Sequence, residues 1–155
     1  MILFCGIPSE PPLALAIEAA EALGAEFIVF NQRHAPYSDA MLDVRGCHIT
    51  GKLWMWEREF PFSLFSGVYT RLMDNYDLPE VRSLEARGTG ARTLEKCASL
   101  HYILNEWFEM AECPVLNRTS AMGSNGSKPH QTQLIAAAGF AVPETLVTND
   151  PHEVP

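Results

Sequence analysis

Two arginines that follow short strand-like segments are the first candidates for chemistry in this sequence. Arg71 comes directly after residues 67–70 (GVYT), where β-branched and aromatic side chains favour a strand, and Arg118 follows a shorter apolar segment. Open parallel sheets bind ligands outside the carboxyl ends of their strands, and a guanidinium pairs bidentately with a carboxylate. We therefore expect Arg71 and Arg118 to bind substrate. The alternative for Arg71 is an ion pair with Asp74 or Asp77, and Arg118 could likewise be held in an ion pair instead of binding substrate.

Other residue types that could catalyse a reaction lack the spacing that their chemistry needs. The five histidines and four cysteines form no HExxH, CxxC or comparable pattern, so the sequence indicates neither a zinc site nor a dense disulfide framework. No GxSxG motif surrounds a serine, which leaves triad chemistry without support. We therefore expect no catalytic or metal-binding residue in this chain.

Two glycine-containing segments could suggest a nucleotide site. FCGIPSEPP follows a strand-like run and precedes a helix, but it has a single glycine, and prolines stand where donor amides would be useful. RGTGAR has neither the spacing nor the lysine of a P-loop. We interpret the first as an ordinary strand-to-helix turn and the second as a loop.

The elements that position Arg71 begin with a strand, a helix and a second strand. Residues 2–7 are a continuous apolar run, typical of a strand buried on both faces. A helix follows, with Ser9 as its cap, prolines in its first turn and Gly24 as its stop. Further strands are expected at residues 27–30, 67–70, 114–116 and 145–148. The pattern predicts an α/β fold with a mainly parallel, Rossmann-like sheet of about five strands flanked by helices.

The remaining segments are predicted from periodicity and from turn residues. Residues 41–45 and 47–55 read as a β-hairpin, and residues 78–92 as a long loop. Apolar positions recur with helical spacing over residues 93–110, and a shorter helix is expected over residues 128–138.

An apolar run at residues 53–56 (LWMW) has two interpretations. It can belong to the core, or it can form a dimer interface, since exposed apolar patches of this kind mark contacts. The sequence leaves both open, so a homodimer is a possible assembly.

Composition excludes several classes of protein. The chain has 155 residues, of which 47% are hydrophobic, and this is enough for the core of a globular domain. The net charge of −8, without a basic run, argues against a nucleic-acid partner. No run approaches the roughly 18 apolar residues that span a bilayer, and no signal peptide is recognisable. We expect a cytoplasmic protein with reduced thiols and no membrane partner.

The C-terminal residues read as the start of a helix that is not completed. Asp150, Pro151 and Glu153 occupy the N-cap, first-turn and capping-box positions of a new helix. The chain stops two residues after Glu153. We therefore expect this sequence to be a fragment of a longer protein.

The segment CPVLNRTSAMGSNGSKPHQTQLIAAAGFAVPETLVTND gives the most specific signal. It resembles the junction between the N-terminal domain and the ATP-binding domain of ATP-grasp ligases. The branch it resembles contains the glutamate ligase that modifies a ribosomal protein and the ATP-grasp maturases of ribosomally made peptides. In that branch a strand like GVYTR, residues 67–71, lies upstream of the junction.

This resemblance implies a reaction in which ATP phosphorylates a carboxylate and an amine or a hydroxyl attacks the acyl phosphate. It implies a pre-ATP-grasp domain at residues 1–120 and the start of an ATP-grasp domain at residues 121–155. Lys128 matches the lysine that reaches the nucleotide phosphates, and a cation near a helix N-terminus suits that anion. The competing interpretation of Lys128 is a solvated surface side chain.

The resemblance also implies that this chain is incomplete as an enzyme. The second ATP-binding lysine and the acidic and Asn ligands of magnesium lie downstream in such enzymes. One lysine without a carboxylate cluster cannot hold magnesium and neutralise a transferring phosphoryl group. ATP and magnesium are therefore expected in the parent protein, with a small-molecule or peptide substrate, and the fragment alone is expected to be inactive.

Two other functions remain open at the level of the sequence. If the protein ends at Pro155, a stand-alone binding or scaffold module is the better interpretation, dimeric through residues 53–56. A nicotinamide- or flavin-dependent oxidoreductase domain would rest on the α/β pattern alone.

Overall fold

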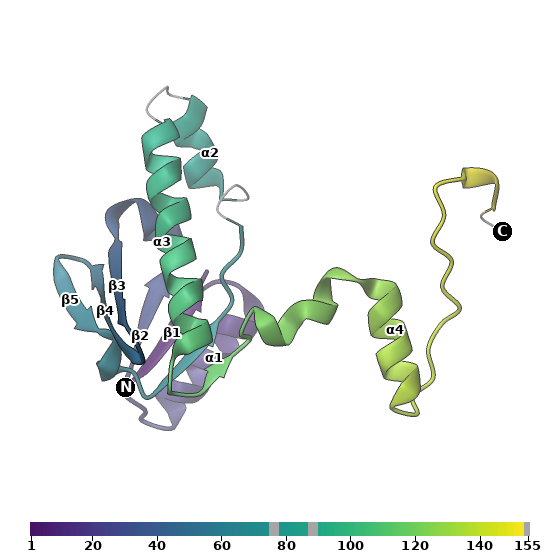
Figure 1. Ribbon diagram of the computed structural model, residues 1–155, viewed down its shortest axis with the longest axis horizontal. Coiled ribbons are helices and arrows are strands. Elements are labelled where there is room, and N and C mark those ends of the chain that lie inside the picture. Colours follow the sequence, from purple (N-terminus) through teal and green to yellow (C-terminus); the bar gives the residue numbers. More distant parts are fainter. Residues whose placement is uncertain (75–77, 87–89, 154–155) are drawn as a thin grey trace. The chain divides into compact units, whose positions relative to one another are not determined.

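The computed structural model describes residues 1–74, 78–86 and 90–153. The chain divides into two compact units, Met1–Arg118 and Thr119–Pro155, which we describe separately. The first unit contains both sheets and the long helix labelled α3 in Figure 1, and the second contains the short helix α4.

A parallel sheet forms the centre of the first unit. Its strands are β1 (Ile2–Gly6), β2 (Phe27–Asn31), β6 (Gly67–Thr70) and β7 (Val115–Leu116), in the order β2-β1-β6-β7, and every pair is parallel. Helix α1 (Pro11–Ala22) connects β1 to β2. Prolines open α1 as predicted, but its N-cap is Glu10 rather than Ser9. Gly24 follows the helix at φ 63°, the left-handed conformation of a glycine stop.

The sheet has four strands rather than the predicted five, because residues 145–148 are irregular. These residues belong to the second unit, whose described part holds no strand. The backbone N–H and C=O groups of a strand need hydrogen-bond partners on a neighbouring strand. The apolar sequence LVT favours an extended conformation but cannot provide that neighbour.

A second sheet is built from the predicted hairpin and one further strand. Strands β3 (Asp39–Arg45), β4 (His48–Met55) and β5 (Arg58–Pro61) are antiparallel neighbours in that order. Gly46, at φ 63°, opens the β3–β4 turn. Trp56 and Glu57 form the β4–β5 turn with φ values of 51° and 62°. Such turns are normally built from Asn and Gly, so residues 56–57 carried no turn signal that would predict β5.

Two helices cover residues that the sequence assigned partly to a loop. Helix α2 (Pro79–Ala86) lies inside the segment predicted as the loop 78–92, so that prediction is wrong there. Leu78 is fully buried and Pro79 opens the helix, which explains why this polar segment folds. Helix α3 (Gly90–Met110) begins earlier than expected and packs against α2. Residues 87–89 of the predicted loop lie outside the described residues.

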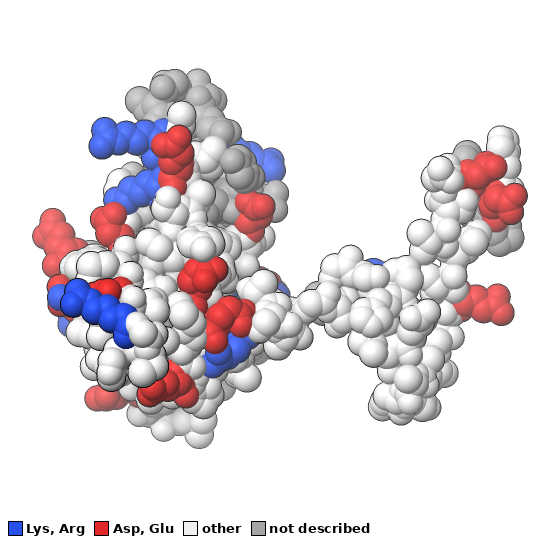
Figure 2. All heavy atoms as spheres, viewed as in Figure 1, with Lys and Arg blue, Asp and Glu red and all other residues white. Residues whose placement is uncertain are grey.

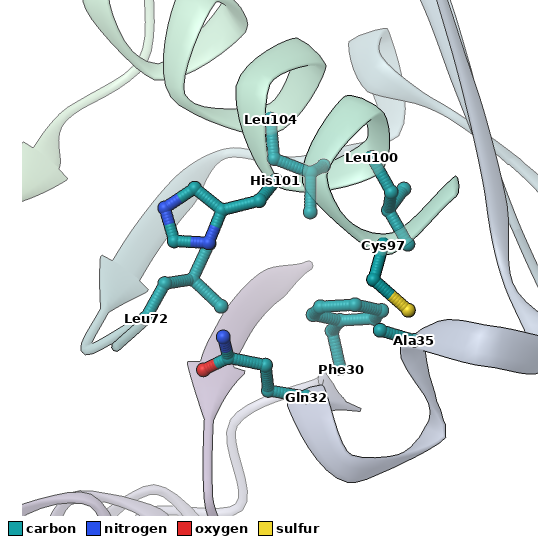
Figure 3. A pocket seen from close by; sticks show the side chains of 8 residues that line it. All are labelled: Phe30, Gln32, Ala35, Leu72, Cys97, Leu100, His101 and Leu104. Atoms are coloured by element: carbon teal, nitrogen blue, oxygen red, sulfur yellow. The ribbon is translucent and has the colours of Figure 1, made fainter. Parts of the chain in front are cut away.

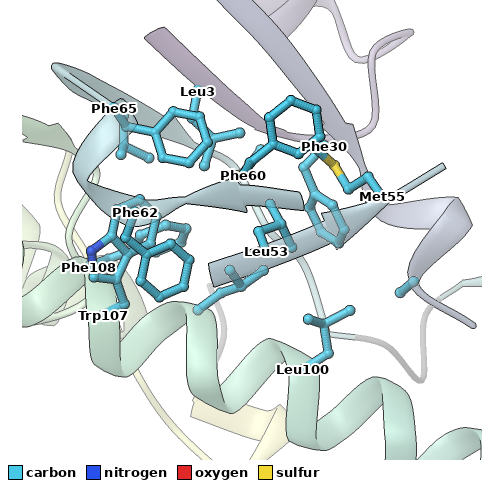
Figure 4. Close-up of a cluster of buried hydrophobic side chains, with 14 of the residues drawn as sticks. Leu3, Phe30, Leu53, Met55, Phe60, Phe62, Phe65, Leu100, Trp107 and Phe108 are labelled. Carbon is cyan, nitrogen blue, oxygen red and sulfur yellow. The ribbon is translucent and has the colours of Figure 1, made fainter. Parts of the chain in front are cut away.

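The main core lies between the two sheets and α3 (Figure 4). Leu3 and Phe30 reach it from the parallel sheet and Leu53 from the antiparallel one. The rings of Phe62 and Trp107 stack at a centroid distance of 3.9 Å. Phe62 belongs to a short 3-10 turn, η2 (Phe62–Leu64), and a longer one, η1 (Gln32–Tyr37), joins β2 to β3. A smaller cluster around Phe4, Leu13 and Ala20 packs α1 on the other face of the parallel sheet.

The apolar run at residues 53–56 does not form one exposed surface patch. Leu53 is 0% and Met55 2% exposed, whereas Trp54 is half-buried and Trp56 is 55% exposed. The alternation follows from the strand, in which successive side chains point to opposite faces. Two residues of the run therefore belong to the core.

The second unit consists of helical turns and irregular chain. It contains η4 (Ser120–Gly126), α4 (Lys128–Ala137) and η5 (Pro151–Glu153). Helix α4 matches the predicted helix at residues 128–138 within one residue. Asp150 Oδ1 accepts a hydrogen bond from the His152 N–H at 2.9 Å, as expected of an N-cap.

In the described ranges, the helices are too short or too polar to cross a lipid bilayer. The face drawn in Figure 2 carries interspersed acidic and basic side chains.

Candidate functional site

Arg71 lies at the carboxyl end of the parallel sheet, where the chain changes direction across it. β2 lies on one side of β1, and β6 and β7 lie on the other. The topological switch point therefore falls between β1 and β6, and open α/β sheets bind ligands there. Arg71 follows β6 directly, and its N–H donates to the Cys5 carbonyl of β1 at 2.7 Å. The switch point thus lies beside Arg71.

Gly6 allows the close approach of the chain at this point. Its φ is 148°, a conformation that residues with side chains rarely adopt. A Cβ at this position would lie 3.0 Å from the Arg71 carbonyl oxygen and 3.1 Å from Leu13 Cδ2. The end of β1 can therefore contact both Arg71 and α1 only because residue 6 is glycine.

Glu10 is the ion-pair partner of Arg71. Arg71 Nη2 donates to Glu10 Oε1, and this hydrogen bond lowers the pKa of the Glu10 carboxyl and raises that of Arg71. The two side chains are 34% and 35% exposed, so solvent screens the pair. The sequence-based alternative did not include Glu10, which is 61 positions away from Arg71. Of its two residues, Asp77 lies outside the described ones.

The guanidinium of Arg71 is only partly used by Glu10. Its Nε is buried and has no hydrogen-bond partner in the part of the chain that the structure describes. Nε and Nη2 form the edge of a guanidinium that binds a carboxylate through two parallel hydrogen bonds. Glu10 accepts from Nη2 alone on that edge. A carboxylate that displaces Glu10 could therefore accept two hydrogen bonds where Glu10 accepts one.

Arg118, the second predicted substrate ligand, is hydrogen-bonded to the end of α3. Its Nη1 donates at 2.6 Å and its Nη2 at 2.8 and 3.2 Å, to the carbonyls of Glu109, Ala111 and Cys113. Such carbonyls have no partner within the helix. The preceding Asn117 has a φ of 67° and donates from Nδ2 to the carbonyl of Thr70 at 2.9 Å. These bonds hold the end of α3 and β7 beside β6, and the substrate role of Arg118 stays a prediction.

Gln32 closes the end of the sheet on the face that α3 covers. Its side chain is buried, Nε2 donates to the Met73 carbonyl at 2.6 Å, and Oε1 accepts from the Met73 N–H at 3.0 Å. Figure 3 shows Gln32, Leu72 and His101 around one small space, which is too narrow for a water molecule. Burial lowers the pKa of His101. Sequence reasoning missed Gln32, because nothing distinguishes it from a surface glutamine.

Lys128 is the first residue of α4 in the second unit. The preceding Ser127 caps the helix, with its Oγ accepting from the His130 N–H at 3.4 Å. The Lys128 side chain is exposed, and its Nζ donates to Gln131 Oε1 at 2.9 Å. An exposed ammonium beside a helix N-terminus fits a phosphate physically. Its role in ATP binding stays a prediction.

The described residues contain no cluster of side chains that commonly bind metals. Among residues 1–74, 78–86 and 90–153, no three His, Cys, Asp or Glu side chains gather where they could hold a metal. The thiols of Cys5 and Cys97 are buried, and burial raises the pKa of both.

Comparisons with known proteins give a consistent result at the level of structure. No protein-family model and no curated protein sequence matches this chain. Solved structures do match. One is a RiPP-associated ATP-grasp ligase from Chryseobacterium gregarium in complex with ADP and a leader and core peptide. It is 24% identical, with a TM-score of 0.69 over 98% of this chain and 45% of that one.

Two further structures extend the comparison. The macrocyclase MdnC from Microcystis aeruginosa MRC, bound with precursor peptide MdnA, is 20% identical, with a TM-score of 0.69 over 99% of this chain and 47% of that one. The ATP-grasp ligase PsnB, complexed with a phosphomimetic variant of its minimal precursor, Mg and ADP, is 27% identical, with a TM-score of 0.64 over 99% of this chain and 49% of that one.

This chain spans about half the length of each of these proteins. The resemblance inferred from the sequence is confirmed: over nearly its whole length, this chain has a fold found in ATP-grasp ligases of the branch that acts on ribosomally made peptides.

Proposed function

We propose that this chain is part of an ATP-dependent carboxylate ligase that acts on a peptide or amino-acid substrate. In the reaction, ATP phosphorylates a carboxylate, and an amine or a hydroxyl attacks the acyl phosphate. Two findings support the proposal. The chain shares its fold with ligases solved together with precursor peptides, and it places a guanidinium at the switch point of its sheet.

Arg71 is the observation that carries the proposal for the first unit. It lies between the end of β1 and the start of α1, where the helix dipole adds to the attraction for an anion. Its Nε has no hydrogen-bond partner among the described residues, and Glu10 accepts from the neighbouring Nη2. In this proposal Arg71 binds a substrate carboxylate, Glu10 orients Arg71 in the free protein, and Arg118 acts by holding β7 in place.

The second unit supports the proposal that residues 121–155 are the first part of an ATP-grasp domain and that residues 1–120 form the pre-ATP-grasp domain. No residue of α4 is buried. Leu134, Ile135, Phe140 and Val147 are 50%, 47%, 70% and 74% exposed. Apolar side chains exposed together usually mark a surface that packs against something else. ATP would supply the phosphoryl group, and Lys128 would hold its phosphates.

We expect this chain alone to lack ATPase activity. The described residues hold one candidate phosphate-binding lysine and no group of side chains suited to magnesium. A phosphate-release assay on the purified chain checks this, and measurable hydrolysis would refute it. A thermal-shift assay with ATP and with NADH tests the oxidoreductase alternative, which stabilisation by NADH alone would favour.

Calorimetry with a blocked peptide tests the substrate site. The probe is a short peptide with one glutamate side chain and no charged ends, and its glutamine counterpart is the matched ligand control. We expect the glutamate peptide to bind and Arg71→Met to weaken binding by about tenfold or more, which corresponds to loss of a charge-assisted hydrogen-bond pair. Arg58→Met removes an arginine on β5, which belongs to the other sheet, and should change nothing. Equal binding of both peptides would contradict the proposal.

A further inference from the structure

Gln32 bridges a gap that the end of β1 leaves in the parallel sheet. β1 lies between β2 and β6 and ends at Gly6, whose partner on β2 is Asn31. Gln32 directly follows Asn31, so it lies beyond the last residue of β1. Its side chain reaches the chain that continues β6: Nε2 donates to the Met73 carbonyl at 2.6 Å, and Oε1 accepts from the Met73 N–H at 3.0 Å. The amide thus takes the place that a peptide group of β1 would occupy, because it offers the same donor and acceptor.

The segment that this bridge holds, residues 71–73, decides where Arg71 points. In β6, Val68 belongs to the main core and Tyr69 to the smaller cluster that packs α1, as expected of successive residues in a strand. The alternation continues beyond the end of β6. Arg71 reaches Glu10 at the start of α1, whereas Leu72 packs against the main core. Arg71 therefore faces the α1 side of the sheet because the segment keeps the alternation of a strand.

The bonds from Gln32 cannot be replaced by water. At the near end of the segment, the Arg71 N–H donates to the Cys5 carbonyl at 2.7 Å, and at the far end Gln32 binds both backbone groups of Met73. Gln32 is 1% exposed, and the space that it lines with His101 is too narrow for a water molecule (Figure 3). Without the amide, the backbone groups of Met73 would lose these partners, which is costly for buried groups. The segment would then have to move to find others.

We propose that Gln32 is a positioning residue, which acts through Met73 to keep the Arg71 guanidinium at the switch point and turned towards the start of α1. The inference rests on the proposed function for the identity of the ligand, a substrate carboxylate, whereas the position of Arg71 can be measured in the free chain. Two substitutions separate the bonds of Gln32 from its bulk. Methionine has a similar size and can neither donate nor accept here. A neutral glutamic acid can do both.

The pKa of Glu10 reports the position of Arg71 without any ligand. The hydrogen bond from Arg71 lowers this pKa. Gln32→Met should raise it towards its usual 4.5, because Arg71 is no longer held beside Glu10. Gln32→Glu should keep it low. Burial raises the pKa of the new carboxyl, so this group is neutral in the acid range where Glu10 titrates, and it can make both bonds to Met73. Nuclear magnetic resonance of the side-chain carboxyl carbon measures the pKa of Glu10 in each variant.

Ser38→Ala is the matched control. Ser38 is also buried and directly follows η1, where its Oγ donates to the His34 carbonyl at 3.2 Å. Its replacement removes a buried hydrogen bond from the same connection and leaves both bonds to Met73 in place, so the pKa of Glu10 should not change. Titratable groups face this region from α3 and from the end of the segment, and every variant keeps them: Cys97, His101 and Asp74.

Calorimetry with the blocked glutamate peptide then links this position to binding. Gln32→Met should weaken binding by about tenfold in the natural chain and change nothing further in Arg71→Met, because it acts through Arg71. If Gln32→Met does not fold by circular dichroism, Gln32→Glu gives the same test alone. Its peptide affinity should fall by about fivefold or more between about pH 5.5 and 9, as the new carboxyl ionises and loses its donor, whereas that of the natural chain should change by less than about twofold.

The outcomes distinguish this inference from the proposed function. If the natural chain ignores the peptide but Gln32→Met raises the pKa of Glu10, the proposed function fails and the positioning role of Gln32 stands. The positioning role would be overturned by an unchanged pKa of Glu10 in Gln32→Met, by an equal rise in Ser38→Ala, or by an equal loss of affinity in the Arg71→Met background. For Gln32→Glu alone, a peptide affinity as independent of pH as that of the natural chain would overturn it.

Discussion

Replacing Gly6 with alanine tests how closely the end of β1 packs against Arg71 and α1 at the switch point. Residue 6 has a φ of 148°, which costs an alanine about 1 to 2 kcal/mol. The added Cβ would also lie 3.0 Å from the Arg71 carbonyl oxygen and 3.1 Å from Leu13 Cδ2. The first neighbour is backbone of the next strand and the second is fully buried, so neither moves freely. Crowding of this kind costs about 1 to 3 kcal/mol.

Gly24→Ala is the matched control for this substitution. Gly24 also has a positive φ, 63°, but a Cβ there would meet nothing within 4 Å. The control carries the conformational cost of a left-handed residue without the crowding. We expect Gly6→Ala to lower the free energy of unfolding by about 3 kcal/mol and Gly24→Ala by about 1 kcal/mol. For a chain of this size the difference corresponds to a melting temperature lower by about 4 to 8 °C.

Urea denaturation of both variants measures the two costs. The same variants can be titrated with the glutamate peptide, because a shift of the Arg71 backbone should also weaken binding at the switch point. If Gly6→Ala proved no more destabilising than Gly24→Ala, the close contact between β1 and Arg71 would be refuted.

Three further predictions concern the ion pair and the antiparallel sheet. The pKa of Glu10 is lowered from its usual 4.5 in the folded chain, so the stability it contributes is present above that value and is lost as the pH falls below it. Glu10→Gln should therefore lower the free energy of unfolding by under about 1 kcal/mol at neutral pH and leave it unchanged in acid. Denaturation at several pH values measures this difference. Leu53→Ala should cost about 3 kcal/mol and Trp56→Ala under about 1, since only Leu53 is fully buried; equal costs would contradict the division of the apolar run. Replacing Trp56 and Glu57 by Asn and Gly should raise the melting temperature by a few degrees, because both residues have positive φ.

The parallel part of the fold could be predicted because its signals are local. Continuous apolar runs marked β1 and β2, and prolines followed by helical spacing marked α1. Two of the features that the sequence did not reveal depend on neighbours distant in the chain. β5 follows a turn built from Trp56 and Glu57, which tertiary packing holds in an uncommon conformation. Residues 145–148 have the composition of a strand but no partner strand in the described part of their unit.

The candidate site could be predicted in part. Arg71 was identified from its place after a strand, and its position at the switch point follows from the strand order. Its partner Glu10 could not be identified, because a carboxylate before two prolines also reads as a helix start. Gln32, which closes the other face through two hydrogen bonds to Met73, carries no sequence signal. Pairings between residues this far apart follow from the packing of the whole sheet.

The most direct test of the central claim observes the Arg71 side chain itself. Its Nε–H has no partner among the described residues, so its nuclear magnetic resonance signal should respond to a bound carboxylate. Titration of the isotope-labelled chain with the blocked glutamate peptide should shift this signal downfield together with the amide signals of Gly6 and Leu72. The glutamine peptide should leave all three unchanged. An Arg71 signal that ignores both peptides, or that responds equally to both, would contradict a carboxylate site at the switch point.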